Sequence, residues 1–138
     1  MSERPAFDNP VPAVGVVCFR DDEVLLIQRG TPPLQGAWSI PGGRIEPGER
    51  ARDAALRELR EETSVEATLV GLVDVVDALM PPRHYVLIDF AARWLAGTPI
   101  AGDDAQHAAF IGMDDLDRLD LWSETRRIID AAHELVSA

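Results

Sequence analysis

The sequence has a single cysteine, few basic residues and no long apolar segment. Because Cys18 has no second cysteine to pair with, a disulfide framework is excluded, and a reducing cytoplasm is the simplest compartment to expect. Cys18 lies in an apolar run, where a cysteine is usually a small buried hydrophobe rather than a nucleophile. No stretch reaches the roughly 20 apolar residues that span a bilayer. The first residues also lack the basic-then-apolar order of a signal peptide.

The shortage of basic residues limits the partners that this chain can have. Lys and Arg together number 13 against 24 Asp and Glu, which gives a formal net charge of −11. Nucleic-acid polymers are bound by basic surfaces, so we expect neither a nucleic-acid polymer nor a membrane as partner. A small phosphorylated substrate is compatible with this charge, because metal ions can neutralise its phosphates.

A chain of 138 residues fits one compact domain, and no linker, internal repeat or low-complexity tract divides it. We therefore expect a single domain over residues 1–138. Residues 1–11 are polar and contain Pro5 and Pro10, so this segment is expected either to stay loose or to lie along an edge.

Runs of β-branched and apolar residues between turn signals predict two hairpins and two short strands. The expected strands cover residues 13–19, 24–29, 38–41, 66–78, 85–95 and 108–112. The loops are expected at 30–36 and 96–106, and residues 113–119 form a turn or a short helical segment. A helix is expected over 50–63, and a last helix is expected to start with Ser123 as its N-cap and to bury Ile128, Ile129, Ala132 and either Leu135 or Val136.

Three glutamates share one side of the helix expected at 50–63. At roughly 100° per residue, Glu62 lies about 40° to one side of Glu58 and Glu61 about 60° to the other. Ala51 and Ala54 are expected on the same face, while the core is expected to contact the opposite one, formed by Leu56, Leu59, Ala55 and Thr63.

Like charges at this spacing repel one another, and a divalent cation removes the repulsion. Carboxylate oxygens are the ligands that Mg²⁺ prefers. The alternative is a solvated acidic face that Arg57 and Arg60 neutralise by pairing.

The residues around these glutamates decide between the two alternatives. Gly43, Glu49 six residues later, the pair Arg57-Glu58, and the pair Glu61-Glu62 after one leucine form a pattern that resembles the signature of the Nudix hydrolases. Ser64 departs from it, because the family usually has a glycine there. A glycine suits a left-handed helix end, whereas a serine in that conformation costs about 1 kcal/mol.

The resemblance implies an α/β fold, namely a Nudix-type α/β/α sandwich with a mixed β-sheet between helices. It also implies an Mg²⁺-dependent pyrophosphohydrolase, with Mn²⁺ as an alternative ion, that cleaves the diphosphate of a nucleoside diphosphate linked to another moiety. The substrate expected is ADP-ribose or a similar nucleotide sugar. The alternatives are a nucleoside triphosphate pyrophosphatase that sanitises oxidised nucleotides and a non-catalytic nucleotide-sensing module. A homodimer is common in such relatives and is a second partner to expect besides the small-molecule nucleotide.

The resemblance also suggests roles for individual residues. Glu58, Glu61 and Glu62 match the metal-binding glutamates, and the backbone carbonyl of Gly42 is expected to add a ligand. Gly43 is expected to let the loop approach the helix by taking a positive φ. Arg57 is counted with the catalytic set in a supporting role, since a pair with Glu49 would brace the loop and orient the metal ligands; a plain surface ion pair is the alternative.

The remaining candidates lie outside the helix. The general base is either one of the three glutamates or an acid of the later loop, Asp103 or Asp104, whose alternative is a solvated turn. Arg29 and Arg44 are expected to bind substrate phosphates, because a guanidinium can donate two parallel hydrogen bonds to a phosphate. His107 is expected to be incidental. The aromatic residues that either stack on a base or belong to the core are Trp38, Tyr85, Trp94, Phe110 and Trp122.

Overall fold

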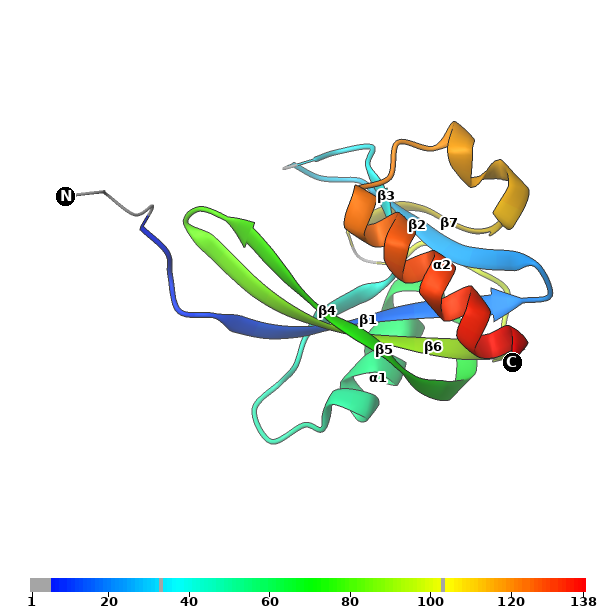
Figure 1. Cartoon of the computed structure of the whole chain (residues 1–138), viewed down its shortest axis with the longest axis horizontal. Helices are drawn as coiled ribbons and strands as arrows, with labels where there is room; N and C mark the ends of the chain where they lie inside the picture. Colours follow the sequence, from blue (N-terminus) through cyan, green and yellow to red (C-terminus); the bar gives the residue numbers. More distant parts are fainter. Residues whose placement is uncertain (1–5, 33, 103) are drawn as a thin grey trace.

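The computed structural model describes residues 6–32, 34–102 and 104–138. In these residues a seven-stranded sheet lies between two α-helices (Figure 1). The strands are β1 (Val11–Arg20), β2 (Glu23–Arg29), β3 (Trp38–Ser39), β4 (Gly42–Arg44), β5 (Glu66–Met80), β6 (Arg83–Ala96) and β7 (Ala105–Gly112). The helices are α1 (Ala51–Thr63) and α2 (Ser123–Ser137), and a 3-10 helix, η1 (Met113–Arg118), precedes α2.

The sheet is mixed, as the sequence predicts. Its main path runs β3-β2-β1-β6-β5, with β4 added to β1 and β7 added to β2. Only the central pair β1–β6 is parallel among the described strands. That pairing sets Gly15 of β1 beside Asp89 of β6, two residues that are far apart in the sequence.

The two helices cover opposite faces of the sheet. Because side chains alternate along a strand, β1 contributes Val14, Val16 and Cys18 to the core under α1, and Val17 and Phe19 to the core under α2. This confirms the α/β/α arrangement. Cys18 is fully buried, and burial raises the pKa of its thiol to about 12, so its role as a small buried hydrophobe is confirmed as well.

The second hairpin is longer than the sequence pattern predicts. The β5–β6 ladder continues to the pair Met80–Arg83, so the expected break over 80–84 is only a two-residue turn. The described part of the N-terminal segment lies against this turn, where the Asp8 backbone N–H donates to the Pro82 carbonyl at 2.8 Å. Val11 already belongs to β1.

The prediction that Ser123 caps the last helix is wrong. Trp122 occupies the N-cap position and Ser123 is the first helical residue; no side chain caps this end of α2 within the described part of the chain. The buried side of α2 is as predicted, and Val136 rather than Leu135 packs against the core. No helix in the described ranges is long and apolar enough to cross a membrane.

The end of α1 has the left-handed residue that the sequence predicts. Ser64 has φ 63° and ψ 10°, and its backbone N–H donates to the Arg60 carbonyl at 2.9 Å. A residue with a β-carbon is strained in this region, and glycine is not.

We therefore predict that Ser64→Gly raises the free energy of unfolding by about 0.5–1 kcal/mol, because the left-handed conformation no longer carries a steric cost. Chemical denaturation of the purified variant measures this. Ser64→Ala is the matched control, since it removes the hydroxyl but keeps the β-carbon, and it should not stabilise the protein. Equal stabilisation by both variants would contradict the conformational explanation.

Candidate active site

The three glutamates of α1 differ in exposure. The buried side of the helix extends closer to the glutamates than the sequence analysis expected. Ala54 and Ala55 are fully buried, together with Leu59 and Thr63. Ala54 therefore belongs to the core rather than to an open acidic face, which corrects that expectation. The side chain of Glu61 is 48% exposed and that of Glu58 14%, while Glu62 has a carboxylate oxygen shielded from solvent.

Two glycines of β4 contact the two less exposed glutamates, Glu58 and Glu62. A β-carbon at Gly43 would collide with the Glu58 carboxylate, so only glycine permits this contact. Gly43 does not have a positive φ, which corrects the expected reason for the glycine. The backbone of Gly42 donates a hydrogen bond to Glu62, so β4 fixes the inner carboxylate from the backbone side.

Arg57 ties the loop before α1 to the helix. Its Nε and Nη2 donate to the two carboxylate oxygens of Glu49 at 2.7 and 2.9 Å, which is the pair predicted from the sequence. Nη2 also donates to the Arg44 carbonyl at 3.0 Å, and Nη1 donates to Glu58 at 2.9 Å and to Glu61 at 3.1 Å. Both partners of the Arg57–Glu49 pair are mostly buried, so this is not a plain surface ion pair.

The electrostatics of Glu62 are those of a carboxylate that lacks a counter-ion. Its Oε2 atom has no hydrogen-bond partner among the residues that the structure describes. Burial, followed by the charge of Glu58, raises the pKa of Glu62 to about 8, although the Gly42 hydrogen bond lowers it. A divalent cation would supply the missing charge, and an orphaned carboxylate oxygen beside a second carboxylate fits such an ion.

As they stand, the described side chains form no group of three His, Cys, Asp or Glu residues arranged to hold a metal ion. Glu58 and Glu62 lie together, whereas Glu61 is paired with Arg57. Glu61 would have to turn from Arg57 toward Glu62 to complete the predicted set of three glutamates.

The loop after β6 is hydrogen-bonded to the C-terminal end of α1. The backbone N–H groups of Ile100 and Gly102 donate to the carbonyls of Thr63 and Glu62, both at 2.9 Å. A β-carbon at Gly102 would collide with the Glu61 carbonyl, so the loop passes directly over the helix. This brings Asp104 near enough to Glu62 to add to the rise in its pKa. Asp103, the other candidate base, lies outside the described residues.

A cavity of about 730 Å³ extends from these glutamates across the sheet to the start of α2. The predicted site residues Arg29, Arg44 and Asp104 line it together with Glu58, Glu61 and Glu62. Further lining residues come from β1, β5, β6 and α2 and include Gly15, Val76, Leu87, Asp89, Glu124, Thr125 and Ile128. The structure thus brings every predicted substrate-binding residue to one hollow.

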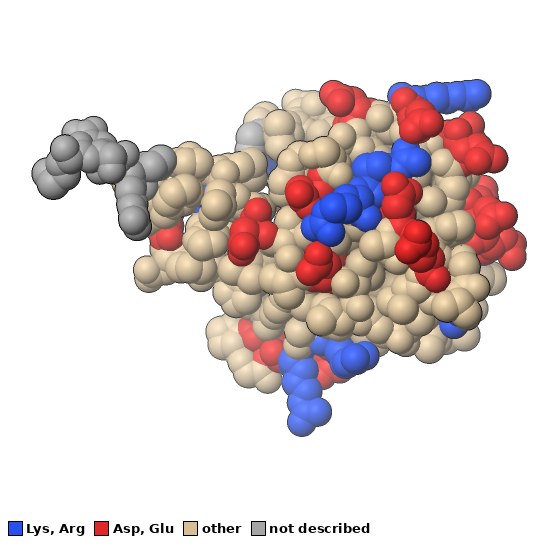
Figure 2. Space-filling view, viewed as in Figure 1, with Lys and Arg blue, Asp and Glu red and all other residues tan. Residues whose placement is uncertain are grey.

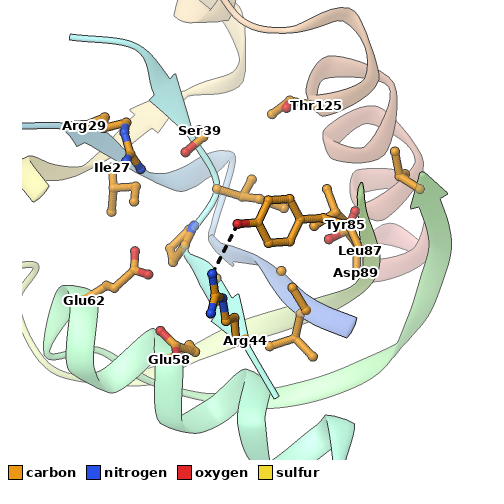
Figure 3. Close-up of a pocket in the computed structure, with 18 of the residues that line it drawn as sticks. Ile27, Arg29, Ser39, Arg44, Glu58, Glu62, Tyr85, Leu87, Asp89 and Thr125 are labelled. Carbon is orange, nitrogen blue, oxygen red and sulfur yellow. Dashed lines mark hydrogen bonds between the residues drawn. The ribbon is translucent and has the colours of Figure 1, made fainter. Parts of the chain in front are cut away.

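The two candidate phosphate ligands stand on different parts of the rim (Figure 3). Arg29 ends β2, and its Nε donates to the Thr31 carbonyl at 3.1 Å. Arg44 ends β4 and reaches the Tyr85 hydroxyl at 3.5 Å. Both arginines therefore belong to the lining of the cavity.

The arginines of the α2 face are paired with acids. Figure 2 shows basic and acidic side chains intermingled on this face. Arg126 pairs with Asp117 and Asp130, and Arg127 pairs with Asp74 and Glu124. These pairs make no cluster of unneutralised positive charge.

The aromatic candidates fall into two groups. Tyr85 and Trp122 line the cavity, whereas Trp38 and Phe110 pack against the two cores. Trp94 lines no part of the cavity and donates from its ring N–H to the Gly97 carbonyl at 2.8 Å. His107 is stacked on Trp38 with ring centroids 6.5 Å apart and is not a lining residue, in agreement with an incidental role.

The sequence analysis missed Asp89, which lines the cavity and is only 4% exposed. Burial, followed by the nearby charge of Asp74, raises the pKa of Asp89 to about 6, and Arg127 opposes this rise. An acid at an inward position of a long apolar strand was the one available signal, since such positions normally hold apolar residues.

The comparisons with known proteins identify the family of this chain. The family model described as the NUDIX domain matches residues 9–132, and the chain belongs to this family. An ADP-ribose pyrophosphatase of Methanocaldococcus jannaschii is 34% identical over 113 residues, which cover 80% of this chain and 67% of that protein. An 8-oxo-dGTP diphosphatase of Proteus vulgaris is 39% identical over 82 residues, which cover 56% of this chain and 70% of that protein.

Solved structures show the same fold. A crystal structure of a MutT NUDIX hydrolase from Burkholderia pseudomallei superposes with a TM-score of 0.81 at 27% identity, covering 90% of this chain and 98% of the other. The protein is therefore a Nudix hydrolase that acts on pyrophosphate bonds, a family that generally uses divalent metal ions.

We predict that Arg57→Lys lowers kcat by about 10- to 100-fold, because an ammonium group cannot hold both Glu49 oxygens and the Arg44 carbonyl at once. Steady-state kinetics with a pyrophosphate-containing nucleotide measure the change. Arg60→Lys is the matched control, since Arg60 is an exposed arginine one turn away on the same helix. Equal kcat values for the two variants would show that the fork on Glu49 is dispensable.

The raised pKa of Glu62 leads to a prediction about stability. Without metal, the folded protein keeps a proton that the unfolded chain releases near pH 4.5, so stability should fall as pH rises from about 4.5 to about 8. Thermal unfolding in a chelator across this range measures the effect. Glu62→Gln should flatten the decline, and adding Mg²⁺ or Mn²⁺ at pH 8 should stabilise the wild-type protein more than this variant. An identical pH profile for both proteins would contradict the assignment.

Proposed function

We propose that this protein is a divalent-metal-dependent pyrophosphohydrolase that cleaves the diphosphate of ADP-ribose or a similar nucleotide sugar. The observation that carries the proposal is the orphaned Glu62 carboxylate oxygen beside Glu58, at the wall of a cavity that Arg29 and Arg44 also line. An inner carboxylate with an unpaired oxygen and arginines that line the same cavity suit a metal-bound diphosphate.

Each site residue has a part in this proposal. Glu58, Glu61, Glu62 and the Gly42 carbonyl would hold Mg²⁺, for which Mn²⁺ can substitute. When bound, the ion neutralises phosphate charge and lowers the pKa of a coordinated water. Arg29 and Arg44 bind the phosphate oxygens, and Arg57 keeps Glu58 in place through their hydrogen bond.

Asp104 contacts the substrate or the attacking water from the loop side. It lies near Glu62, is exposed and lines the cavity. Removal of a proton from the water falls either to one of the three glutamates or to Asp104, and the variant Asp104→Asn distinguishes these two roles by its effect on kcat.

The choice of substrate rests on the relatives. The ADP-ribose pyrophosphatase matches 80% of this chain, whereas the 8-oxo-dGTP diphosphatase matches 56%. A nucleoside triphosphate is therefore the second candidate. A non-catalytic module is disfavoured, because all three glutamates and Arg57 are present.

Two further parts of the proposal concern the setting of the protein. A homodimer would cover the apolar side chains that β5 exposes at the edge of the sheet, Leu72, Val75 and Leu79. A cytoplasmic location suits the single, fully buried Cys18.

We predict that the protein with Mg²⁺ converts ADP-ribose to AMP and ribose 5-phosphate. A screen of ADP-ribose, dinucleotides, other nucleotide sugars and oxidised nucleoside triphosphates, with products separated by chromatography, tests this. Glu61→Gln and Glu62→Gln should each lower kcat by orders of magnitude while the fold is kept. Asp53→Asn is the matched control, because it removes an exposed acid from the same helix. Unchanged kcat in both glutamine variants would overturn the assignment.

A further inference from the structure

Asp89 is a buried acid that the reaction described above does not use. It lies in β6 beside Gly15 of β1, and a β-carbon at Gly15 would collide with its carboxylate. The glycine therefore leaves the space that the carboxylate occupies. Although Asp89 is only 4% exposed, its side chain makes no hydrogen bond to any residue that the structure describes.

Apolar residues line the cavity together with Asp89, and they donate no hydrogen bonds to its carboxylate. Val76 of β5, Leu87 of β6 and Ile128 of α2 line the same part of the cavity and are apolar. The charged groups that act on Asp89 are Asp74, which disfavours its ionised form, and Arg127, which favours it. Arg127 is itself paired with Asp74 at 3.1 Å. Asp89 lines the cavity, and its carboxylate oxygens are not among the fully buried atoms that lack a partner, so a ligand in the cavity can donate a hydrogen bond to them.

The position of Asp89 indicates which part of a ligand would reach it. Figure 3 shows Tyr85, Leu87 and Asp89 on one side of the cavity and Glu58 and Glu62 on the other. If the glutamates hold the diphosphate through a metal ion, the nucleoside part of the substrate extends toward the Asp89 side. This step rests on the proposed function.

We propose that Asp89 determines base specificity by accepting a hydrogen bond from an exocyclic amino group of the substrate's nucleobase. An ionised carboxylate is only an acceptor, so it pairs with the amino group of a purine such as adenine or guanine and rejects a base edge that presents only oxygen. The apolar residues around it suit the faces of a flat base better than they suit a ribose with its hydroxyl groups.

The test measures equilibrium binding by calorimetry at pH 7.5 for two pairs of mononucleotides that differ by one amino group. The first pair is AMP and purine riboside 5′-monophosphate, and the second is GMP and IMP. Mononucleotides contain no diphosphate to cleave, so a failure here is separate from a failure to hydrolyse ADP-ribose. In at least one pair, the wild-type protein should bind the amino-bearing member about 10- to 100-fold more tightly.

Variants at position 89 connect this preference to the carboxylate. Asp89→Leu, close in size and apolar, should abolish the preference while leaving the Kd of the desamino member nearly unchanged. Asp89→Asn keeps one acceptor oxygen and should retain part of the preference. Asp77→Asn is the matched control on β5, because Asp77 is exposed and does not line the cavity, and it should retain all of the preference.

Several results would overturn the proposal. One is equal binding within each pair by the wild-type protein, and another is a preference that survives in Asp89→Leu. Absence of measurable binding for all four mononucleotides would also refute it, since the cavity would then not admit a nucleotide. An equal loss of affinity for both members of a pair in Asp89→Leu, with weaker binding of 2′-deoxy-AMP than of AMP by the wild-type protein, would assign Asp89 to the ribose instead.

Discussion

The site depends on the hydrogen bonds that the guanidinium of Arg57 donates. This group is a single cation within reach of Glu49, Glu58 and Glu61, and it also holds the Arg44 carbonyl. A mostly buried charge is stable only when its donors and acceptors are satisfied, and here the planar fork satisfies both oxygens of Glu49. The loop between β4 and α1 is fixed by this arrangement, because the same side chain binds it at two points.

The remaining geometry follows from that anchored loop. With β4 held against α1, Gly43 can lie on the Glu58 carboxylate and the Gly42 backbone can reach Glu62. The innermost glutamate is thereby held beside Glu58 with one carboxylate oxygen buried and unpaired. Its raised pKa shows that negative charge is disfavoured there, which makes the site receptive to a cation. If Glu62 holds the ion as proposed, stability and function oppose each other there, since the burial that favours ion binding weakens the ion-free fold.

Local patterns were sufficient to predict α1, its glutamates and its left-handed end at Ser64, because those features depend on residues close together in sequence. The same reasoning was wrong about Ala54. It placed this residue on the helix face of the glutamates, whereas Ala54 is buried in the core. It also failed at Ser123, where a favourable cap residue falls one position inside the helix. Helix ends are set by packing as well as by preference, and here the chain enters α2 from Trp122.

Asp89 could not have been assigned from the sequence for a different physical reason. The role proposed for it arises from the parallel pairing of β6 with β1, which connects segments that are far apart in the sequence and depends on the order of strands. Within β6 alone, an acid among apolar residues has no partner to identify. Only the pairing shows that Gly15 makes room for it and that the cavity reaches it.

The site therefore has two parts. One part is a continuous segment that carries the signature of the family, and the other is a wall built from distant segments, to which we assign the selection of a substrate. The residues from Gly42 to Glu62 form one continuous segment, and in the proposed function they bind the diphosphate, a group that ADP-ribose and 8-oxo-dGTP both contain. The opposite wall is assembled from β1, β5, β6 and α2, and it can vary without disturbing the Arg57 anchor. Relatives named for different substrates are consistent with this division, because under the two proposals a change of one side chain on that wall would alter the contacts to the base and leave α1 intact.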